Sequence, residues 1–182
     1  FHGGYYAVIE SIAKIVALGG DYRKVRLTFQ EYFERLGNDP AKWGKPFSSL
    51  LGAFMVQKAL DIPSIGGKDS MSGSFEVLNA PPSLLSFGVT YDKIQNIVSK
   101  EFKEIGSNVV LIKLNIDNNG LVDFEQLKNN YNRIKKLIDN KEVLASSSIG
   151  FGGVARSIAE MCLGNKVGFK FNEIETEELF KP

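Results

Sequence analysis

Residues 62–73, IPSIGGKDSMSG, bring together residue types that are suited to bind an anion. Gly66 and Gly67 follow an apolar lead and precede Lys68 and Asp69. Adjacent glycines permit positive φ angles and let a ligand approach backbone N–H groups that no Cβ shields. Lys68 adds a positive charge, and Asp69 adds oxygen atoms for a metal or a sugar hydroxyl. The segment is therefore either a ligand-binding loop or an ordinary turn, because glycine with polar residues is typical of both.

The P-loop motif of nucleotide-binding proteins does not match this segment. Lys68 is followed by Asp69 where a P-loop has Ser or Thr, and Ile62 stands where its first glycine belongs. The next residues, GSFEVL, are typical of a strand, whereas a P-loop leads into a helix. Any anion site here is therefore of another kind.

A second glycine-rich segment, SSSIGFGG at residues 146–153, precedes a helix predicted over residues 154–163. A glycine-rich turn between a strand and a helix directs free N–H groups, and the positive end of the helix dipole, at an anion. A serine that caps the helix N-terminus explains the serines equally well. Both interpretations stay open at this point.

Other polar or reactive side chains have simpler interpretations. Glu10 and Lys14 lie four positions apart on a predicted helix, which is typical of a solvated ion pair. Cys162, on an apolar helical face without a basic neighbour, is expected to be a core thiol. Trp43 is expected to anchor a loop by packing.

Composition excludes several classes of site. The chain of 182 residues has 22 Lys and Arg against 21 Asp and Glu, so its overall charge does not favour a nucleic-acid partner. With His2 and Cys162 as the single residues of their types, a histidine-based metal site, a catalytic triad and a four-cysteine zinc cage are excluded. No apolar run has the length of a membrane span, so we expect a soluble, cytoplasmic protein without a membrane partner. The absence of an initial methionine suggests a piece of a longer protein.

The elements that must position these residues follow from apolar periodicity and turn residues. In the first half, we predict helices over 5–18 and around 47–55, strands over 22–29, 74–79 and 83–91, and a loop over 35–44. In the second half, we predict a short helix over 92–105, helices that start after Asp123 and at Val154, and strands over 108–115, from 142 and over 167–174.

Several of these stretches together resemble the phosphoribosylformylglycinamidine synthase family. The resemblance rests on IPSIGGKDSMSG, on APPSLLSFGV after it, on AVIESIAKIVALGG before it, and on LASSSIGFGGVARSIAEM. It covers nearly the whole chain and is strongest to the second of two homologous synthetase-like halves of the long form. It implies an α/β (α+β) fold of two PurM-like, or aminoimidazole ribonucleotide synthetase-like, domains. Residues 1–91 would be the nucleotide-binding type domain without its first strand, and residues 92–182 a C-terminal domain truncated near Pro182.

The resemblance also implies an activity for a longer parent enzyme. This family is an ATP-dependent amidoligase of purine biosynthesis that converts formylglycinamide ribonucleotide, glutamine and ATP to formylglycinamidine ribonucleotide. ATP phosphorylates an amide oxygen, and ammonia displaces the phosphate with the help of magnesium and backbone dipoles. The implied partners are a small-molecule substrate, the first synthetase half and a glutaminase domain, and the isolated fragment is expected to be inactive.

Matched residue by residue, Glu10 falls on a magnesium-ligand glutamate of the family. The positions that fall on nucleotide- or substrate-binding segments are Gly66, Gly67, Lys68, Asp69, Ser70, Gly152 and Gly153. No residue of the chain is assigned a catalytic role.

The chain departs from the family pattern at two metal ligands. Lys14 stands where the family has an asparagine, and Ser148 stands where it has an acidic residue. We therefore expect weak or absent binding of ATP or ADP with magnesium, with the Lys14 ammonium in place of the metal's charge. The alternatives are a non-catalytic structural half with a degenerate nucleotide site, or another ATP-dependent enzyme of the PurM superfamily.

Overall fold

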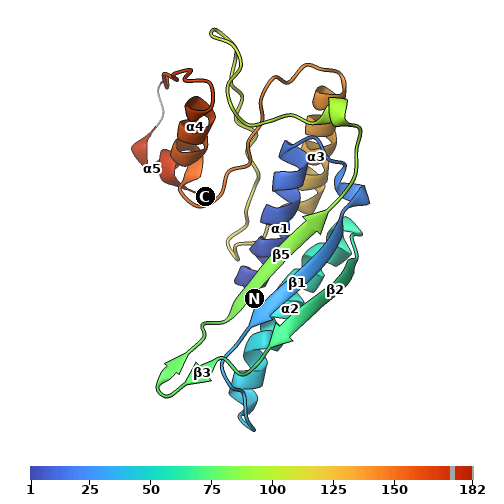
Figure 1. Ribbon diagram of the computed structural model, residues 1–182, viewed down its shortest axis with the longest axis vertical. Coiled ribbons are helices and arrows are strands. Elements are labelled where there is room, and N and C mark those ends of the chain that lie inside the picture. The colour runs from blue at the N-terminus through green and yellow to red at the C-terminus, as the bar shows by residue number, and fades with distance from the viewer. Residues whose placement is uncertain (173–174, 182) are drawn as a thin grey trace.

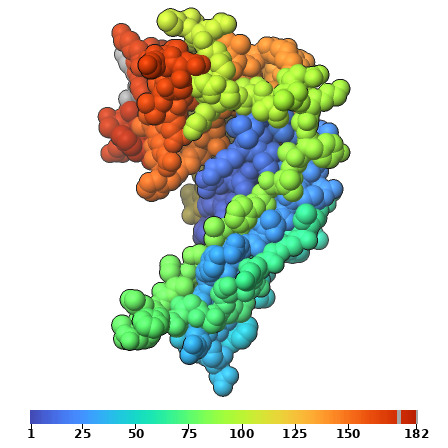
Figure 2. Space-filling model, viewed as in Figure 1, coloured from blue at the N-terminus to red at the C-terminus, as the bar shows by residue number. Residues whose placement is uncertain are grey.

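A three-stranded mixed sheet forms the centre of the first half of the chain in the computed structural model, which describes residues 1–172 and 175–181. The strand order is β2 (Ser64–Ser70), β1 (Arg26–Tyr32) and β5 (Ser83–Val89). β1 pairs with β2 in parallel and with β5 in antiparallel orientation. Helices α1 (His2–Ala17) and α2 (Pro40–Leu60) cover one face of this sheet (Figure 1). The space-filling view shows the three strands at the surface on the other face (Figure 2).

The alternation of side chains along β1 decides which face is the core. Leu27, Phe29 and Glu31 are buried against the helices, whereas Thr28 and Gln30 lie between them on the open face. The predicted strand over 22–29 is confirmed from Arg26 onward, but its beginning is a turn of 3₁₀-helix, Tyr22–Lys24. The predicted strand over 83–91 corresponds to β5.

Helix α1 is the predicted first helix, with the expected apolar side. Tyr5, Val8, Ile12 and Val16 are fully or almost fully buried, and their spacing places them on one face. The hydroxyl of Tyr5 accepts a hydrogen bond from the N–H of Val122 at 3.0 Å, which joins the N-terminus to the second half of the chain.

Helix α2 begins earlier than the sequence predicts. The predicted loop over 35–44 is wrong from Pro40 onward, because the Asp39 carboxylate accepts a hydrogen bond from the N–H of Ala41, and Pro40 occupies the first turn. Trp43 therefore lies on a helix, where 51% of it is exposed, and the prediction that it anchors a loop is wrong.

The two helices meet at glycines. A Cβ built on Gly4 would lie 2.2 Å from the carbonyl oxygen of Ser49, and one on Gly52 would lie 2.2 Å from the carbonyl oxygen of Phe1. These distances allow no side chain, so the helices approach backbone to backbone. The face of α2 that is turned inward accordingly carries small residues, including Ser49, Gly52 and Ala53.

A small hairpin replaces the predicted strand over 74–79. Strands β3 (Ser74–Phe75) and β4 (Leu78–Asn79) pair in antiparallel orientation, and Glu76 adopts a φ of 51° at the turn.

The second half contributes mainly helices, namely α3 (Phe124–Asp139), α4 (Gly153–Leu163), α5 (Thr176–Phe180) and a 3₁₀ turn, Ile94–Asn96. The predicted capping pair of Asp123 and Gln126 is confirmed in part. The Asp123 carboxylate accepts hydrogen bonds from the N–H groups of Glu125 and Gln126, both at 3.0 Å, whereas the Gln126 side chain accepts from the N–H of Asn115. Leu127 and Tyr131 of α3 are buried in the same core as α1 and the sheet. The short helix predicted over 92–105 is reduced to the 3₁₀ turn.

Three strands predicted in the second half are absent from the residues that the structure describes. Residues 108–115, residues 142–150 and residues 167–172 form no strand, and residues 173–174 of the last segment lie outside the described residues. In the first of these segments, Val110 is 76% exposed. A strand needs a neighbour for its backbone hydrogen bonds, and these apolar segments have none here.

The result is a mixed α/β fold. A smaller second cluster, formed by Phe102, Ile158 and Met161, lies beside α4. The division into domains at residues 91 and 92 stays a prediction. Within the described residues, no helix is both long enough and apolar enough to cross a membrane.

The contact between α1 and α2 can be tested with two substitutions on one helix. Gly52→Ala places a methyl group against the Phe1 carbonyl, so it should lower the free energy of unfolding by roughly 1–3 kcal/mol in urea titrations. Gly44→Ala is the control, since nothing lies within 4 Å of its Cβ. It should raise stability by about 0.5–1 kcal/mol through helix propensity. Equal effects of the two substitutions would contradict the close helix contact.

Candidate functional site

The segment Gly66–Ser70, predicted as a ligand loop or a turn, is an extended edge strand. It belongs to β2, where Gly67 lies opposite Phe29 and Lys68 opposite Gln30 in the parallel register. Gly66 and Gly67 do not adopt the positive φ angles that a turn would use. The prediction of loop or turn is therefore wrong at the level of local structure, because the backbone pairs with β1 instead of reversing direction.

Packing between β1 and β2 explains why residue 67 is a glycine. A Cβ built on Gly67 would lie 2.7 Å from the carbonyl oxygen of Phe29, so β2 can approach β1 here only with glycine. Gly66 is different, since the nearest atom to its built Cβ is the Thr28 hydroxyl oxygen at 3.9 Å. The sheet therefore requires glycine at Gly67 and tolerates a side chain at Gly66.

The open face of the sheet has a shallow depression beside Lys68. Its volume is about 330 Å³, and its lining consists of Thr28, Phe29, Gln30, Gly67, Lys68 and Phe87. Lys68 is exposed to solvent there. The predicted residues of β2 are thus accessible at a hollowed surface.

On the helix side of the sheet lies a buried carboxyl group that the sequence reasoning missed. Glu31 is 0% exposed, and neither of its carboxylate oxygens has a hydrogen-bond partner. Burial, together with the nearby carboxylate of Asp69 on β2, raises the pKa of Glu31 to about 7. The sequence did carry a signal, because Glu31 takes the third inward position after Leu27 and Phe29 on an alternating strand.

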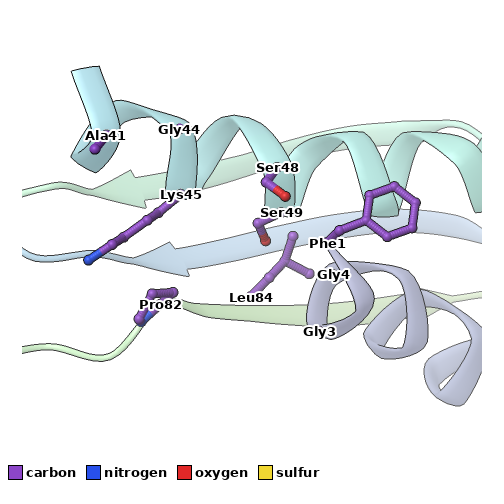
Figure 3. Close-up of a pocket in the computed structure, with 10 residues that line it drawn as sticks. All are labelled: Phe1, Gly3, Gly4, Ala41, Gly44, Lys45, Ser48, Ser49, Pro82 and Leu84. Carbon is purple, nitrogen blue, oxygen red and sulfur yellow. The ribbon is translucent and has the colours of Figure 1, made fainter. Parts of the chain in front are cut away.

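A larger depression opens between the N-terminal parts of α1 and α2 and the start of β5 (Figure 3). It measures about 410 Å³ and is lined by Phe1, Gly3, Gly4, Ala41, Gly44, Lys45, Ser48, Ser49, Pro82 and Leu84. Figure 3 shows the Lys45 side chain extending away from Ser48 and Ser49. Its ammonium group pairs with Glu34. The charge that lines this depression is therefore already compensated.

Glu10 and the second glycine-rich segment lie next to each other. The exposed Glu10 carboxylate pairs with the Lys14 ammonium at 2.7 Å, as the simple interpretation of their spacing predicts. A Cβ built on Gly150 would lie 3.3 Å from the same Glu10 oxygen. The structure thus brings together residues that are 140 positions apart.

Glycines, and not serines, begin helix α4. Gly152 is its N-cap with a φ of 89°, and no side chain caps the helix, so the alternative of a serine cap is wrong. The oxygen of Leu179 lies 2.4 Å from a Cβ built on Gly153, so the glycine allows α5 to pack here. The Ser157 hydroxyl donates to the carbonyl oxygen of Ser148 at 3.2 Å.

The residues around Glu10 do not fit a magnesium ion. Its nearest charged partner is the Lys14 ammonium, which would repel a cation. No group of three or more His, Cys, Asp or Glu residues lies close enough to hold a metal among residues 1–172 and 175–181. A hard divalent cation prefers several oxygen ligands, and the described residues do not gather three such side chains at Glu10.

The predicted site residues fall into two places. Gly66–Ser70 lie on β2 at one edge of the sheet. Glu10 lies on α1, which covers a face of the sheet, and Gly152 and Gly153 begin α4 on the side of β5 (Figure 1). Contacts within this chain therefore do not assemble them into one site.

Comparisons with known proteins agree with the resemblance drawn from the motifs. No protein-family model matches the chain. It is 23% identical over 195 residues to the phosphoribosylformylglycinamidine synthase subunit PurL of Thermococcus sibiricus, a match that covers 98% of this chain and 26% of that protein. A solved structure described as T. maritima PurL complexed with ATP shares the fold with a TM-score of 0.61 at 14% identity, over 97% of this chain and 30% of the other.

These findings establish distant homology to PurL over nearly the whole chain. They also show that the chain spans about a quarter of the length of the curated relative. The fold is confirmed as a mixed α/β fold that resembles part of PurL.

The buried carboxyl group predicts an unusual dependence of stability on pH. The pKa of Glu31 is raised from 4.5 to about 7 in the folded protein. The stabilisation that its protonated form gives is therefore complete below pH 4.5, and it is lost as the pH rises through 7. Glu31→Gln should remove this loss and raise stability at about pH 8, relative to about pH 5, by roughly 2 kcal/mol in urea titrations.

Glu34→Gln is the control with the opposite sign. Its hydrogen bonds with Lys45 and Lys42 lower the pKa of Glu34, so this substitution should reduce stability once the carboxylate is ionised. A wild-type pH profile in the Glu31→Gln protein would show that Glu31 is ionised in the folded state at neutral pH.

Proposed function

We propose that this chain, a distant homologue of the phosphoribosylformylglycinamidine synthase subunit PurL, is one section of an ATP-dependent amidoligase of purine biosynthesis. The parent enzyme would convert formylglycinamide ribonucleotide, glutamine and ATP to formylglycinamidine ribonucleotide. The observation that carries this proposal is the homology over 98% of the chain, which includes the GGKDS segment. The isolated section would be inactive.

The proposed contribution of this section is the strand that carries Lys68. Lys68 is exposed beside a depression on the open sheet face, where a phosphorylated small molecule can reach it. Around it, Leu85, Phe87 and Val89 are 43%, 49% and 58% exposed. An exposed apolar surface of this kind is typical of an interface. We therefore assign this face to the rest of the parent, namely the first synthetase-like half and the glutaminase domain, which would complete the site.

A nucleotide is proposed at the other place, where Glu10, Lys14 and Gly150 meet. The Lys14 ammonium would pair with a phosphate of ATP or ADP, and N–H groups of the first turn of α4 would donate to it. The N–H of Gly153 is not one of them, because it donates to the carbonyl oxygen of Gly150. Because the residues do not fit magnesium, binding would not require that metal. The chain's distant homologue of known structure is described as a complex with ATP.

The second candidate is a structural half whose nucleotide site has decayed. Two features favour this alternative. Glu10 forms an ion pair with Lys14, and Ser148 stands where the family has an acidic residue. In that case, the section would stabilise the active half by packing without binding a nucleotide.

Calorimetric titration with ADP separates these two candidates. We expect weak binding by the chain, with the same affinity in magnesium and in a chelator. Lys14→Ala should weaken binding roughly tenfold, because it removes a charged hydrogen-bond donor. Lys128→Ala, which breaks a similar helix ion pair with Glu125, should leave the affinity unchanged. Magnesium-dependent binding would contradict the proposed site, and no binding at all would favour the structural half.

The role of β2 is tested in the full-length parent. Lys68→Ala should lower synthetase turnover at least tenfold while glutaminase activity and the melting temperature stay constant, because Lys68 is exposed and packs little. Glu76→Ala, on the exposed hairpin turn, is the matched control. Normal turnover in the Lys68→Ala enzyme would remove the support for a substrate-binding strand.

A further inference from the structure

Helix α2 carries an apolar row on its outer surface. Trp43, Phe47, Leu50 and Phe54, here called the α2 stripe, are 51%, 66%, 41% and 57% exposed. Leu51 and Met55 flank it and are 43% and 37% exposed. The sequence indicates an amphipathic helix from the same residues other than Trp43, but the structure turns them away from the core.

The reason for this inversion lies in the inner face of α2. Where Ser49 and Gly52 meet the backbone of α1, the inner face has room for small residues alone, whereas Val56 and Leu60 are buried further along the helix. The aromatic side chains of α2 and Leu50 occupy the outer face, where no described segment covers them. The indole N–H of Trp43 already donates to the carbonyl oxygen of Gly37 at 2.9 Å, so its ring is available for apolar contact.

The spacing of the stripe suits a helical partner. Its members follow one another at intervals of four, three and four residues, which is the a/d spacing of helices that pack side by side. Helix α2 is 21 residues long and offers this seam over several turns. A second α2 helix has the same seam.

Charges at the rim favour an antiparallel pair of α2 helices. If a two-fold axis passes midway between Phe47 and Leu50, Phe47 faces the other copy's Leu50 and Trp43 faces its Phe54. The same axis places Lys58 opposite Asp39, which forms an attractive pair on each side. Lys42 and Lys45 do not oppose this arrangement, because Glu34 pairs with both.

We propose that the α2 stripe is a dimer interface between two copies of this chain, packed as antiparallel α2 helices. A stable interface buries roughly 800 Å² on each partner, and a single helical seam supplies only part of that area. The dimer should therefore be weak, with a dissociation constant in the micromolar range. This inference does not depend on the proposed ligase function.

The open sheet face is the competing surface. In the register of β1 and β5, Leu85 lies opposite the polar Gln30, and Phe87 lies opposite the polar Thr28. The α2 stripe is uninterrupted by polar side chains along its four positions. The stripe is therefore the better self-complementary surface of the two.

Sedimentation velocity of the 182-residue chain over a range of micromolar concentrations tests the proposal. The wild type should pass from monomer to dimer as concentration rises. Phe54→Glu should stay monomeric at every concentration, because it places a charge in the seam. The matched control is Phe87→Glu on the open sheet face, which should dimerise like the wild type. Circular dichroism checks that both variants are folded.

Two results would overturn the interface. A wild type that stays monomeric throughout would mean that another part of a longer protein covers the stripe. Dimerisation that is lost in Phe87→Glu but kept in Phe54→Glu would assign the dimer to the sheet face.

The antiparallel arrangement has its own test. Lys58→Glu should weaken the dimer roughly fivefold, because it replaces two attractive pairs by repulsive ones. Lys128→Glu, at a half-buried lysine of α3, should have no effect. An unchanged dimer affinity in Lys58→Glu would overturn the antiparallel register.

Discussion

The backbone contact between α1 and α2 determines how the rest of this molecule is arranged. Where Gly4 meets Ser49 and Gly52 meets Phe1, the helices approach so closely that side chains have no room. The two helices lie on the same face of the sheet, and the other face is uncovered. The backbone contact also reverses the expected polarity of α2, whose small residues face inward and whose aromatic residues face outward. The exposed apolar row of α2 therefore follows from this contact.

Elements whose periodicity reflects burial could be predicted from the sequence. Helices α1, α3 and α4 and strand β5 are found where apolar spacing places them. The start of α2 was not predicted, because Asp and Pro are typical of turns as well as of helix N-termini. In the structure, Asp39 is the N-cap and Pro40 the first residue of α2. Strands predicted in the second half did not form, because an apolar run specifies a strand only when a neighbouring strand accepts its hydrogen bonds.

The candidate site was predicted in part. The motifs identified the homology to PurL, and the helical spacing of Glu10 and Lys14 correctly indicated their ion pair. Sequence alone did not indicate that Gly150 lies beside Glu10, since this contact depends on how distant segments pack. The alternation along β1 does carry a signal for Glu31, but a charged residue within a strand is normally assigned to the solvent side, so its burial was not predicted. The assignments of substrate and nucleotide positions stay predictions.

The close approach of β2 to β1 at Gly67 bears on how signature motifs are interpreted. A methyl group there would collide with the Phe29 carbonyl, whether or not a ligand ever binds. Selection for a folded sheet alone would therefore preserve Gly67 in the GGKDS motif after catalysis had been lost. A search that finds the GGKDS motif consequently detects shared architecture. The sheet does not need the exposed Lys68, so retention of this lysine would indicate a working enzyme.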